Sequence, residues 1–162
     1  MLSGYRRVAV TLTIVLLLKR ISRPHAAVLG RLPDGSGYGD VERHPDAEIV
    51  PGLLIFRLDA PLFFANATLM RGRLRALVLD ADPPYQVVLL DLEATSDLDL
   101  ESADTLAGLR EDLDREGIEL WLTRVHAPVR EMLDRMNPAD RVGEKWIFPS
   151  VFAGVKAYQE RA

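Results

Sequence analysis

Two segments of the chain are almost wholly apolar over the length of a β-strand. Residues 86–92 read QVVLLDL and residues 118–123 read IELWLT. Continuous apolar runs of this length indicate strands that are buried on both faces, as in a parallel sheet. Upstream, Pro51-Gly52 separates residues 48–50 from residues 53–59, LLIFRLD, which predicts a hairpin of two short strands.

Between these strands, apolar residues recur at the spacing of a helix. A helix over residues 68–81, with Asn66 or Thr68 as its N-cap, is predicted from four residues on one helical face: Met70, Leu74, Leu77 and Val78. The other predicted elements are a short strand at 62–64, helices at 101–116 and 129–136, an edge strand at 146–148, and a last helix that ends near 159 and is capped by Ser150.

This order of elements predicts the fold class. Strands that alternate with helices imply parallel strand pairs joined by right-handed crossovers. We therefore expect an α/β fold, a small mixed β-sheet with helices mainly on one side.

The N-terminal segment differs in character from the rest. Residues 8–18 read VAVTLTIVLLL, and Lys19, Arg20 and Arg23 follow. This run is shorter than the roughly 20 residues needed to span a bilayer. It is compatible with the inner end of a membrane helix whose upstream part is missing. In that case the basic residues would mark the cytoplasmic side of the membrane. A cleaved signal peptide ranks lower, and an amphipathic or buried helix packed on the body is the remaining alternative.

Three regions are expected along the chain. Residues 1–21 are the membrane-proximal helix or the end of a membrane helix, residues 22–45 a linker, and residues 46–162 the folded domain. The linker prediction rests on the glycine-rich stretch RLPDGSGYG, which has no lysine and no preceding strand and so is not a phosphate loop.

Composition and charge exclude several functions. The chain has no cysteine, and its three histidines are far apart at no metal-ligand spacing, so we expect no metal and no cofactor. Residues 1–33 carry six basic residues and no acidic one, whereas the rest carries 14 basic and 24 acidic residues. A basic lead-in before an acidic body fits anionic lipid headgroups and argues against nucleic acid as a partner.

The most unusual stretch is LDLEATSDLDLESAD, residues 90–104, which carries six acidic residues. Asp97, Asp99 and Glu101 fall where a helix is predicted to begin, and the helix dipole favours negative charge there. Asp99 is predicted to cap this helix, with Ser102 three residues on. A calcium loop is excluded because Ser102 stands where that loop needs glycine. No nucleophile or histidine accompanies the acids, so we predict no enzymatic activity.

At this stretch the sequence resembles a known family. A buried strand ending in an aspartate, then a loop, then Asp99-Leu100-Glu101-Ser102 opening a helix is similar to the STAS domain of anti-sigma-factor antagonists and SulP anion permeases. The stretches SRPHAAVLGRLP, PGLLIFRLDAPLFFANA and WIFPSVFAGVKAY resemble the SulP (sulfate permease) branch. The similarity covers about residues 22–158.

The resemblance implies a function. We expect a regulatory STAS domain on the cytoplasmic side of the cell inner membrane, part of a SulP transporter of sulfate or a related anion. Its expected partners are the transporter membrane core or a second STAS domain, and the membrane through the N-terminal segment. The chain, either a fragment or separately encoded, is expected to have no transport activity by itself.

One departure from the family pattern concerns phosphorylation. Antagonist STAS domains carry a phosphorylatable Ser or Thr where this chain has Glu101. Glu101 is therefore expected to make the loop permanently charged, and Ser96 and Ser102 are the remaining candidate acceptors. The predicted interaction loop comprises Ser96, Asp97, Asp99, Glu101 and Ser102. Two alternatives stay open: a free antagonist that binds an anti-sigma factor, and a nucleotide-binding STAS domain.

Overall fold

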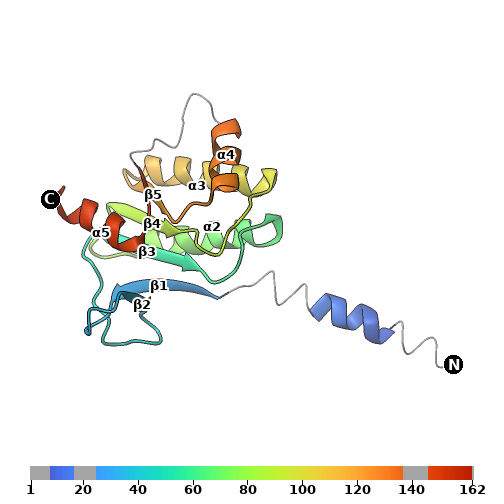
Figure 1. The fold of residues 1–162 in the computed structure, drawn as a ribbon, viewed down its shortest axis with the longest axis horizontal. Helices are drawn as coiled ribbons and strands as arrows, with labels where there is room; N and C mark the ends of the chain where they lie inside the picture. Colours follow the sequence, from blue (N-terminus) through green and yellow to red (C-terminus); the bar gives the residue numbers. More distant parts are fainter. Residues whose placement is uncertain (1–7, 17–24, 137–145, 162) are drawn as a thin grey trace.

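The computed structural model describes residues 8–16, 25–136 and 146–161 (Figure 1). Within them, six strands form one sheet with the spatial order β2-β1-β3-β4-β5-β6. The strands are β1 (Ala26–Arg31), β2 (Tyr38–Asp40), β3 (Leu53–Leu58), β4 (Val87–Asp91), β5 (Glu119–Thr123) and β6 (Ile147–Phe148). Strands β3 to β6 are parallel, whereas β1 pairs antiparallel with both β2 and β3. The predicted α/β fold with a mixed sheet is confirmed.

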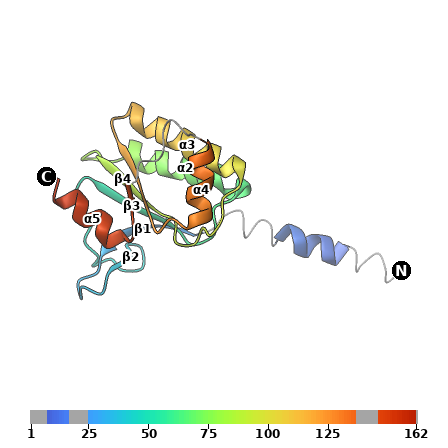
Figure 2. The ribbon, with the colours of Figure 1, turned by 45° about the horizontal axis from the view of Figure 1, so that its top comes forward.

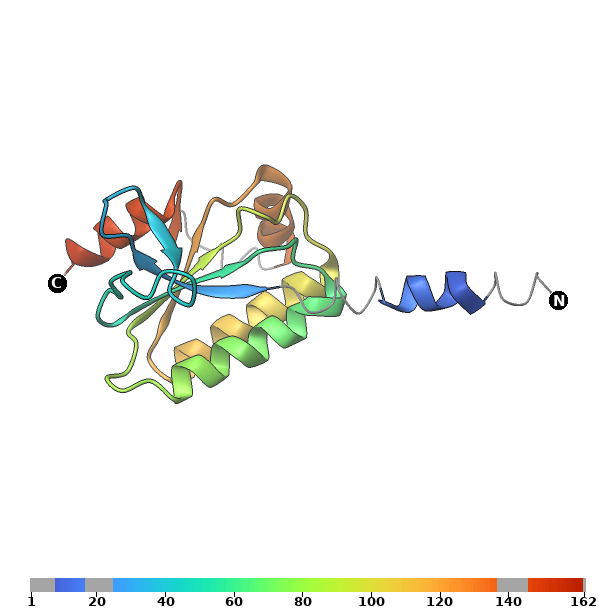
Figure 3. The ribbon, with the colours of Figure 1, turned by 90° about the horizontal axis from the view of Figure 1, so that it is seen from below.

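The helices cover the two faces of the sheet unequally. They are α2 (Phe64–Leu79), α3 (Leu100–Arg115), α4 (Ala127–Met136) and α5 (Val151–Gln159). Of these four helices, the first three lie on one face and α5 lies on the other (Figure 2). Helices α2 and α3 run side by side in the same direction (Figure 3), because each crosses over between parallel strands. Their N-termini therefore lie at the same edge of the sheet.

The predicted linker over residues 22–45 is wrong for part of its length. Strands β1 and β2 lie within it, and Ala27 and Leu29 are buried in the core beneath α5. The glycines there serve close packing as well as turning. A Cβ on Gly30 would lie 3.0 Å from the Cβ of Ala47, so only glycine fits that position without displacing its neighbour.

Two predictions near the start of α2 are also wrong. Residues 48–50 form no strand apart from an isolated bridge between Glu48 and Arg31, because β3 takes β1 and β4 as its partners. Residues 62–64 form no strand, because α2 begins at Phe64. Asn66 is not the N-cap but the third helical residue, and its side chain accepts a hydrogen bond from the Phe63 N–H at 3.0 Å. Together with a hydrogen bond from the Asn66 N–H to the Phe63 carbonyl oxygen at 3.0 Å, it closes a first turn upstream of the predicted start of the helix.

Residues 8–16 form a helix, the blue segment of Figure 1. Its apolar side chains are exposed. Val8 is 67% exposed and Leu16 57%, which contradicts the alternative in which this helix is buried against the body. Within the described part of the chain, no helix is long and apolar enough to cross a membrane. The basic residues Lys19, Arg20 and Arg23 lie outside the described residues.

Candidate functional site at the carboxyl edge of the sheet

The acidic stretch leaves the sheet at the end of β4 and reaches α3 across the edge where the parallel strands end. Asp91, the last residue of β4, is directly beside Arg57 of β3 and Thr123 of β5. Open α/β sheets bind their ligands at this carboxyl edge. The predicted interaction loop therefore occupies the position at which this architecture places function.

Asp99 is the predicted cap of α3, and it also caps a second helix. One carboxylate oxygen accepts a hydrogen bond from the Ser102 N–H at 2.8 Å, and the other accepts one from the Phe64 N–H at 2.9 Å. Partial burial acts to raise the pKa of Asp99, but hydrogen bonding from Ser102 and from the Phe64 N–H outweighs it and holds the pKa below its ordinary value. The residue thus ties the N-termini of α2 and α3 together.

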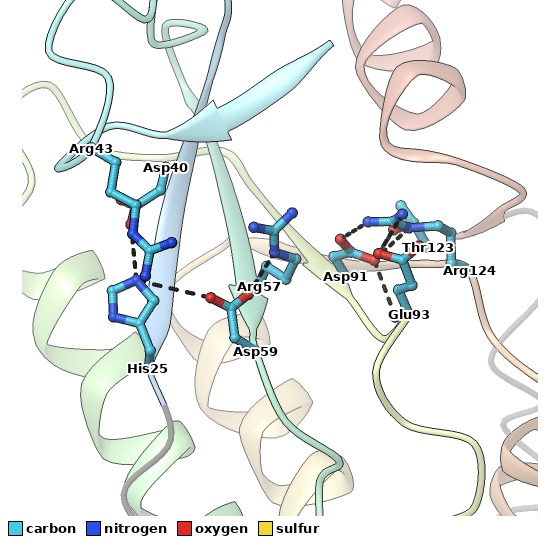
Figure 4. Close-up of polar contacts among 9 residues, drawn as sticks. All are labelled: His25, Asp40, Arg43, Arg57, Asp59, Asp91, Glu93, Thr123 and Arg124. Carbon is cyan, nitrogen blue, oxygen red and sulfur yellow. Dashed lines mark hydrogen bonds and ion pairs between the residues drawn. The ribbon is translucent and has the colours of Figure 1, made fainter.

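Asp91 and Arg124 form a partly buried ion pair where the loop leaves β4 (Figure 4). The Arg124 guanidinium contacts the fully buried Asp91 carboxylate through two nitrogens, and a third nitrogen lies 2.6 Å from Glu93. The Thr123 hydroxyl donates to Asp91 at 3.3 Å. Arg124 has a φ of +53°, a left-handed conformation that is rare for a residue with a side chain and is held here by these contacts.

The five predicted loop residues differ in exposure, and Asp99 is half-buried. Ser96, Asp97 and Glu101 are exposed. Ser102 is fully buried, and its hydroxyl has no hydrogen-bond partner among the described residues. A kinase cannot reach a hydroxyl in that position, so Ser96 is the accessible candidate acceptor.

Two exposed apolar residues lie beside these acids, and neither belongs to the predicted interaction loop. Phe64 is 59% exposed and Leu100 60% exposed, and each is the first residue of its helix. Asp99 binds the Phe64 backbone and precedes Leu100, which brings the two side chains to the same edge. The acidic ledge, as we call it, consists of these two residues and four polar ones: Ser96, Asp97, Asp99 and Glu101.

A second set of charges lies on the same edge, on the other side of β3 (Figure 4). His25 Nε2 lies 2.8 Å from the buried Asp40 carboxylate and 4.0 Å from that of Asp59. Arg57 donates to Asp59 at 2.9 Å. Burial acts to raise the pKa of Asp40, but hydrogen bonds from the Glu42 N–H and His25 hold it below its ordinary value. These pairs connect the start of β1 to the end of β3.

No group of three or more His, Asp or Glu side chains in the described ranges is arranged to hold a metal ion. The carboxylates of the ledge bind backbone N–H groups or point into solvent. The arrangement offers fixed negative charge and exposed apolar side chains, which are features of a surface for binding another protein.

Comparisons with known proteins identify the family. The STAS domain model matches residues 44–153. A probable sulfate transporter of Mycobacterium tuberculosis is 40% identical over 154 residues, covering 94% of this chain and 27% of that protein. Sulfate transporter 3.1 of Arabidopsis thaliana is 31% identical over 159 residues, covering 93% of this chain and 24% of that protein. The chain thus spans about a quarter of the length of these curated relatives.

Solved structures share the fold. The murine anion transporter Slc26a9 matches with a TM-score of 0.83 at 22% identity, over 95% of this chain and 25% of that one. The SulP transporter STAS domain from Vibrio cholerae matches with a TM-score of 0.59 at 19% identity, over 75% and 91%. A putative anti-sigma factor antagonist from Thermotoga maritima matches with a TM-score of 0.55 at 19% identity, over 70% and 90%. By sequence and by fold, this chain belongs to the STAS domain family, and its homologues include proteins named sulfate transporters.

Proposed function

We propose that this chain is the regulatory and interaction domain of a SulP-type transporter of sulfate or a related anion, on the cytoplasmic side of the cell inner membrane. The observation that carries the proposal is the 40% identity to the mycobacterial relative over 94% of this chain. That similarity extends well beyond residues 44–153, which the domain model matches, so it includes much of the segment that leads into the domain.

The proposed activity is binding, and the chain performs neither transport nor catalysis by itself. Exposed Phe64 and Leu100 supply apolar area that a partner can cover, and Asp97 and Glu101 supply charge at its rim. Glu101 carries a charge that no phosphatase can remove, so the ledge stays in one electrostatic state. The proposed partners are the transporter membrane core or a second STAS domain.

The N-terminal segment is proposed to hold the domain at the membrane. The helix at 8–16 exposes Val8, Val10, Leu12, Ile14 and Leu16, and apolar side chains of this kind partition into a bilayer interface. The basic residues that follow it, Lys19, Arg20 and Arg23, would each contribute about 1 kcal/mol near anionic lipid headgroups.

Vesicle binding tests the membrane part of the proposal. The full chain should sediment with vesicles of phosphatidylglycerol and phosphatidylethanolamine, whereas a chain lacking residues 1–24 should stay in solution. The deletion stops at 24 because β1 begins at Ala26, and a longer one would remove a core strand. Equal sedimentation of the two proteins would contradict a membrane role for the segment.

Binding to a transporter core tests the docking part. The membrane portion of the mycobacterial relative, purified without its own STAS domain, should retain this chain on size-exclusion chromatography in detergent. Glu101→Lys should weaken that binding about tenfold or more, because it reverses a charge on the ledge. Glu116→Lys is the control, because Glu116 is an exposed acid at the opposite end of the same helix. The proposal fails if neither the core nor a second copy of the chain is bound.

A free antagonist would behave differently. The antagonist structures share only the fold with this chain, at 17–19% identity. An antagonist that switches by phosphorylation would accept phosphate within the peptide 94–104, and mass spectrometry after incubation with a cognate kinase would detect it. Phosphate on Ser96 would overturn the fixed-charge reading of the ledge.

A further inference from the structure

The solvent-facing side of α2 is apolar, although no described part of the chain covers it. Leu69 is 52% exposed and Leu79 65% exposed, and the exposed residues Gly72 and Ala76 lie between them. These four residues, which we call the outer stripe, are three or four positions apart and so share one side of the helix. The opposite side of α2 is packed in the core. A helix that is apolar on both sides is normally buried, so the outer stripe indicates a contact that one chain does not provide.

The two helices that share this layer carry opposite charges. Helix α2 contains three arginines and no acidic residue, whereas α3 contains five acidic and two basic residues. Within the chain, Arg71 and Arg75 both bind Asp112 of α3. Arg73 is exposed and has no ion pair among the described residues. The layer therefore presents a basic, apolar strip beside an acidic strip.

The heights of the two helices can be matched residue by residue. Arg71 donates to Asp112 at 2.8 Å, and a Cβ on Gly108 would touch the Arg71 guanidinium. A helix rises about 1.5 Å per residue, so Arg73 lies about 3 Å beyond Arg71 and level with Glu111, which is 72% exposed. At 3.6 residues per turn, Arg73 points away from α3. The two level charges therefore do not meet within one chain.

A second copy of the chain would bring them together. A two-fold axis parallel to the helices lays α2 of one copy on α3 of the other, and the same contact is repeated on the other side of the axis. The basic helix then faces the acidic one at both contacts. Arg73 of each copy comes level with Glu111 of the other, on the same flank of the interface. The outer stripe is covered at the same time.

The direction of the helices fits two copies attached to one membrane. Strand β1 begins at the carboxyl edge of the sheet, because Ala26 pairs with Leu58, the last residue of β3. The N-termini of α2 and α3 lie at that same edge, where Asp99 binds both. An axis parallel to the helices keeps the N-terminal segments of both copies at one end, whereas antiparallel packing would separate them. This step alone rests on the proposed function.

We propose that the outer face of α2 and α3 is an interface between two copies of this chain, in which α2 of each copy packs on α3 of the other. The outer stripe provides the apolar area, and the pairing of Arg73 with Glu111 fixes the register. Residues 34–162 carry 14 basic and 24 acidic residues, and this net charge makes the contact weak in solution. Attachment of both copies to one membrane raises their effective concentration and favours it.

Sedimentation velocity of the full chain over a range of concentrations would test the proposal, in a nonionic detergent that covers the apolar helix at 8–16. We expect a reversible equilibrium between monomer and dimer. Arg73→Glu and Glu111→Arg should each weaken dimerisation about tenfold, because each places like charges across the interface. The double variant should recover the original affinity to within about threefold. Lys156→Glu is the control, because it reverses a 64% exposed charge on α5, on the other face of the sheet.

Leu79→Gln separates the interface from the fold. Because Leu79 is exposed in the single chain, this variant should keep its melting temperature while dimerising about threefold or more weakly. The proposal is overturned if the chain stays monomeric at every concentration, or if it dimerises equally well with Arg73→Glu, Glu111→Arg and Leu79→Gln. In the latter case the association runs through residues 8–16. Arg73 and Glu111 are not ledge residues, so this interface and docking at the ledge fail independently.

Disulfide trapping would establish the direction of packing, because the chain has no cysteine of its own. Arg73→Cys combined with Glu111→Cys should give a disulfide-linked dimer on mild oxidation. Arg73→Cys alone should not, because the proposed axis holds the two copies of position 73 on opposite flanks of the interface. A linked dimer of the single variant would show α2 packed on α2 and would overturn the proposed arrangement.

Discussion

The Asp99 carboxylate accepts a hydrogen bond from the Phe64 N–H at 2.9 Å, across 35 residues of sequence, while its other oxygen caps its own helix. One side chain thus satisfies the first turns of two adjacent helices. We expect Asp99→Ala to destabilise the domain by about 2 kcal/mol, since each lost cap costs about 1 kcal/mol. Asp99→Asn keeps one acceptor oxygen, so its stability should lie between that of the unaltered protein and that of Asp99→Ala. Urea unfolding followed by circular dichroism would measure this, and Asp104→Ala, an exposed acid of the same helix, is the control.

A second prediction concerns Asp112, which joins α2 to α3. Its buried carboxylate lies within 2.9 Å of Arg71 and Arg115 and 3.6 Å from Arg75. Arg71 and Arg75 of α2 thus reach across to a carboxylate of α3. Asp112→Asn should cost about 2–3 kcal/mol at neutral pH, because hydrogen bonds to charged groups are among the stronger ones. Asp114→Asn, on a 59% exposed residue, should cost much less.

The effect of Asp112→Asn should also depend on pH. The hydrogen bond from Arg71, despite burial, holds the pKa of Asp112 below the ordinary value of 3.8. Folding therefore favours the ionised carboxylate, and this stabilisation is fully present above 3.8 and is lost as the pH falls through the lowered pKa. Urea unfolding at several values between pH 7 and pH 2 would give the free energy of unfolding of the unaltered protein and of Asp112→Asn. The difference between these two free energies should shrink at the acidic end. A difference that stays constant with pH would contradict a lowered pKa for Asp112 in the folded protein.

A third prediction separates the backbone of Arg124 from its side chain. Arg124→Ala and Arg124→Gly both remove the guanidinium from the buried Asp91, so both should be strongly destabilised. Only glycine adopts a φ of +53° without steric cost, so Arg124→Gly should be more stable than Arg124→Ala by about 1 kcal/mol. Thermal unfolding of the two variants side by side would decide. The reverse order would show that the backbone relaxes once the ion pair is gone.

A fourth prediction uses two glycines that both lie inside helices. A Cβ on Gly154 of α5 would lie 2.8 Å from the Leu89 side chain in the core, whereas one on Gly72 of α2 would meet open space. Gly154→Ala should therefore destabilise by about 1–3 kcal/mol through overpacking. Gly72→Ala should stabilise by about 0.5–1 kcal/mol, because alanine is the better helix former. Chemical denaturation measures both, and stabilisation by Gly154→Ala would contradict the packing of α5 on β4.

The pattern of apolar residues was sufficient to predict most elements from residue 86 onward. Strands β4 and β5 are continuous apolar runs, and Asp99 and Ser150 were predicted as caps because a short side-chain oxygen before a helix binds its free N–H groups. These features are local, since each depends on residues close together in the chain. The charged, exposed positions of Asp97 and Glu101 follow for the same reason.

The rest was decided by tertiary structure. Strands β1 and β2 are short and rich in small residues, and they are strands because β3 offers an edge for pairing. The second role of Asp99 and the ion pair of Arg124 with Asp91 arise from residues that are distant in sequence. Hydrophobic periodicity records which face of an element is buried, but not which other element covers it. Contacts between elements depend on the packed arrangement of the whole chain, and no local pattern encodes them.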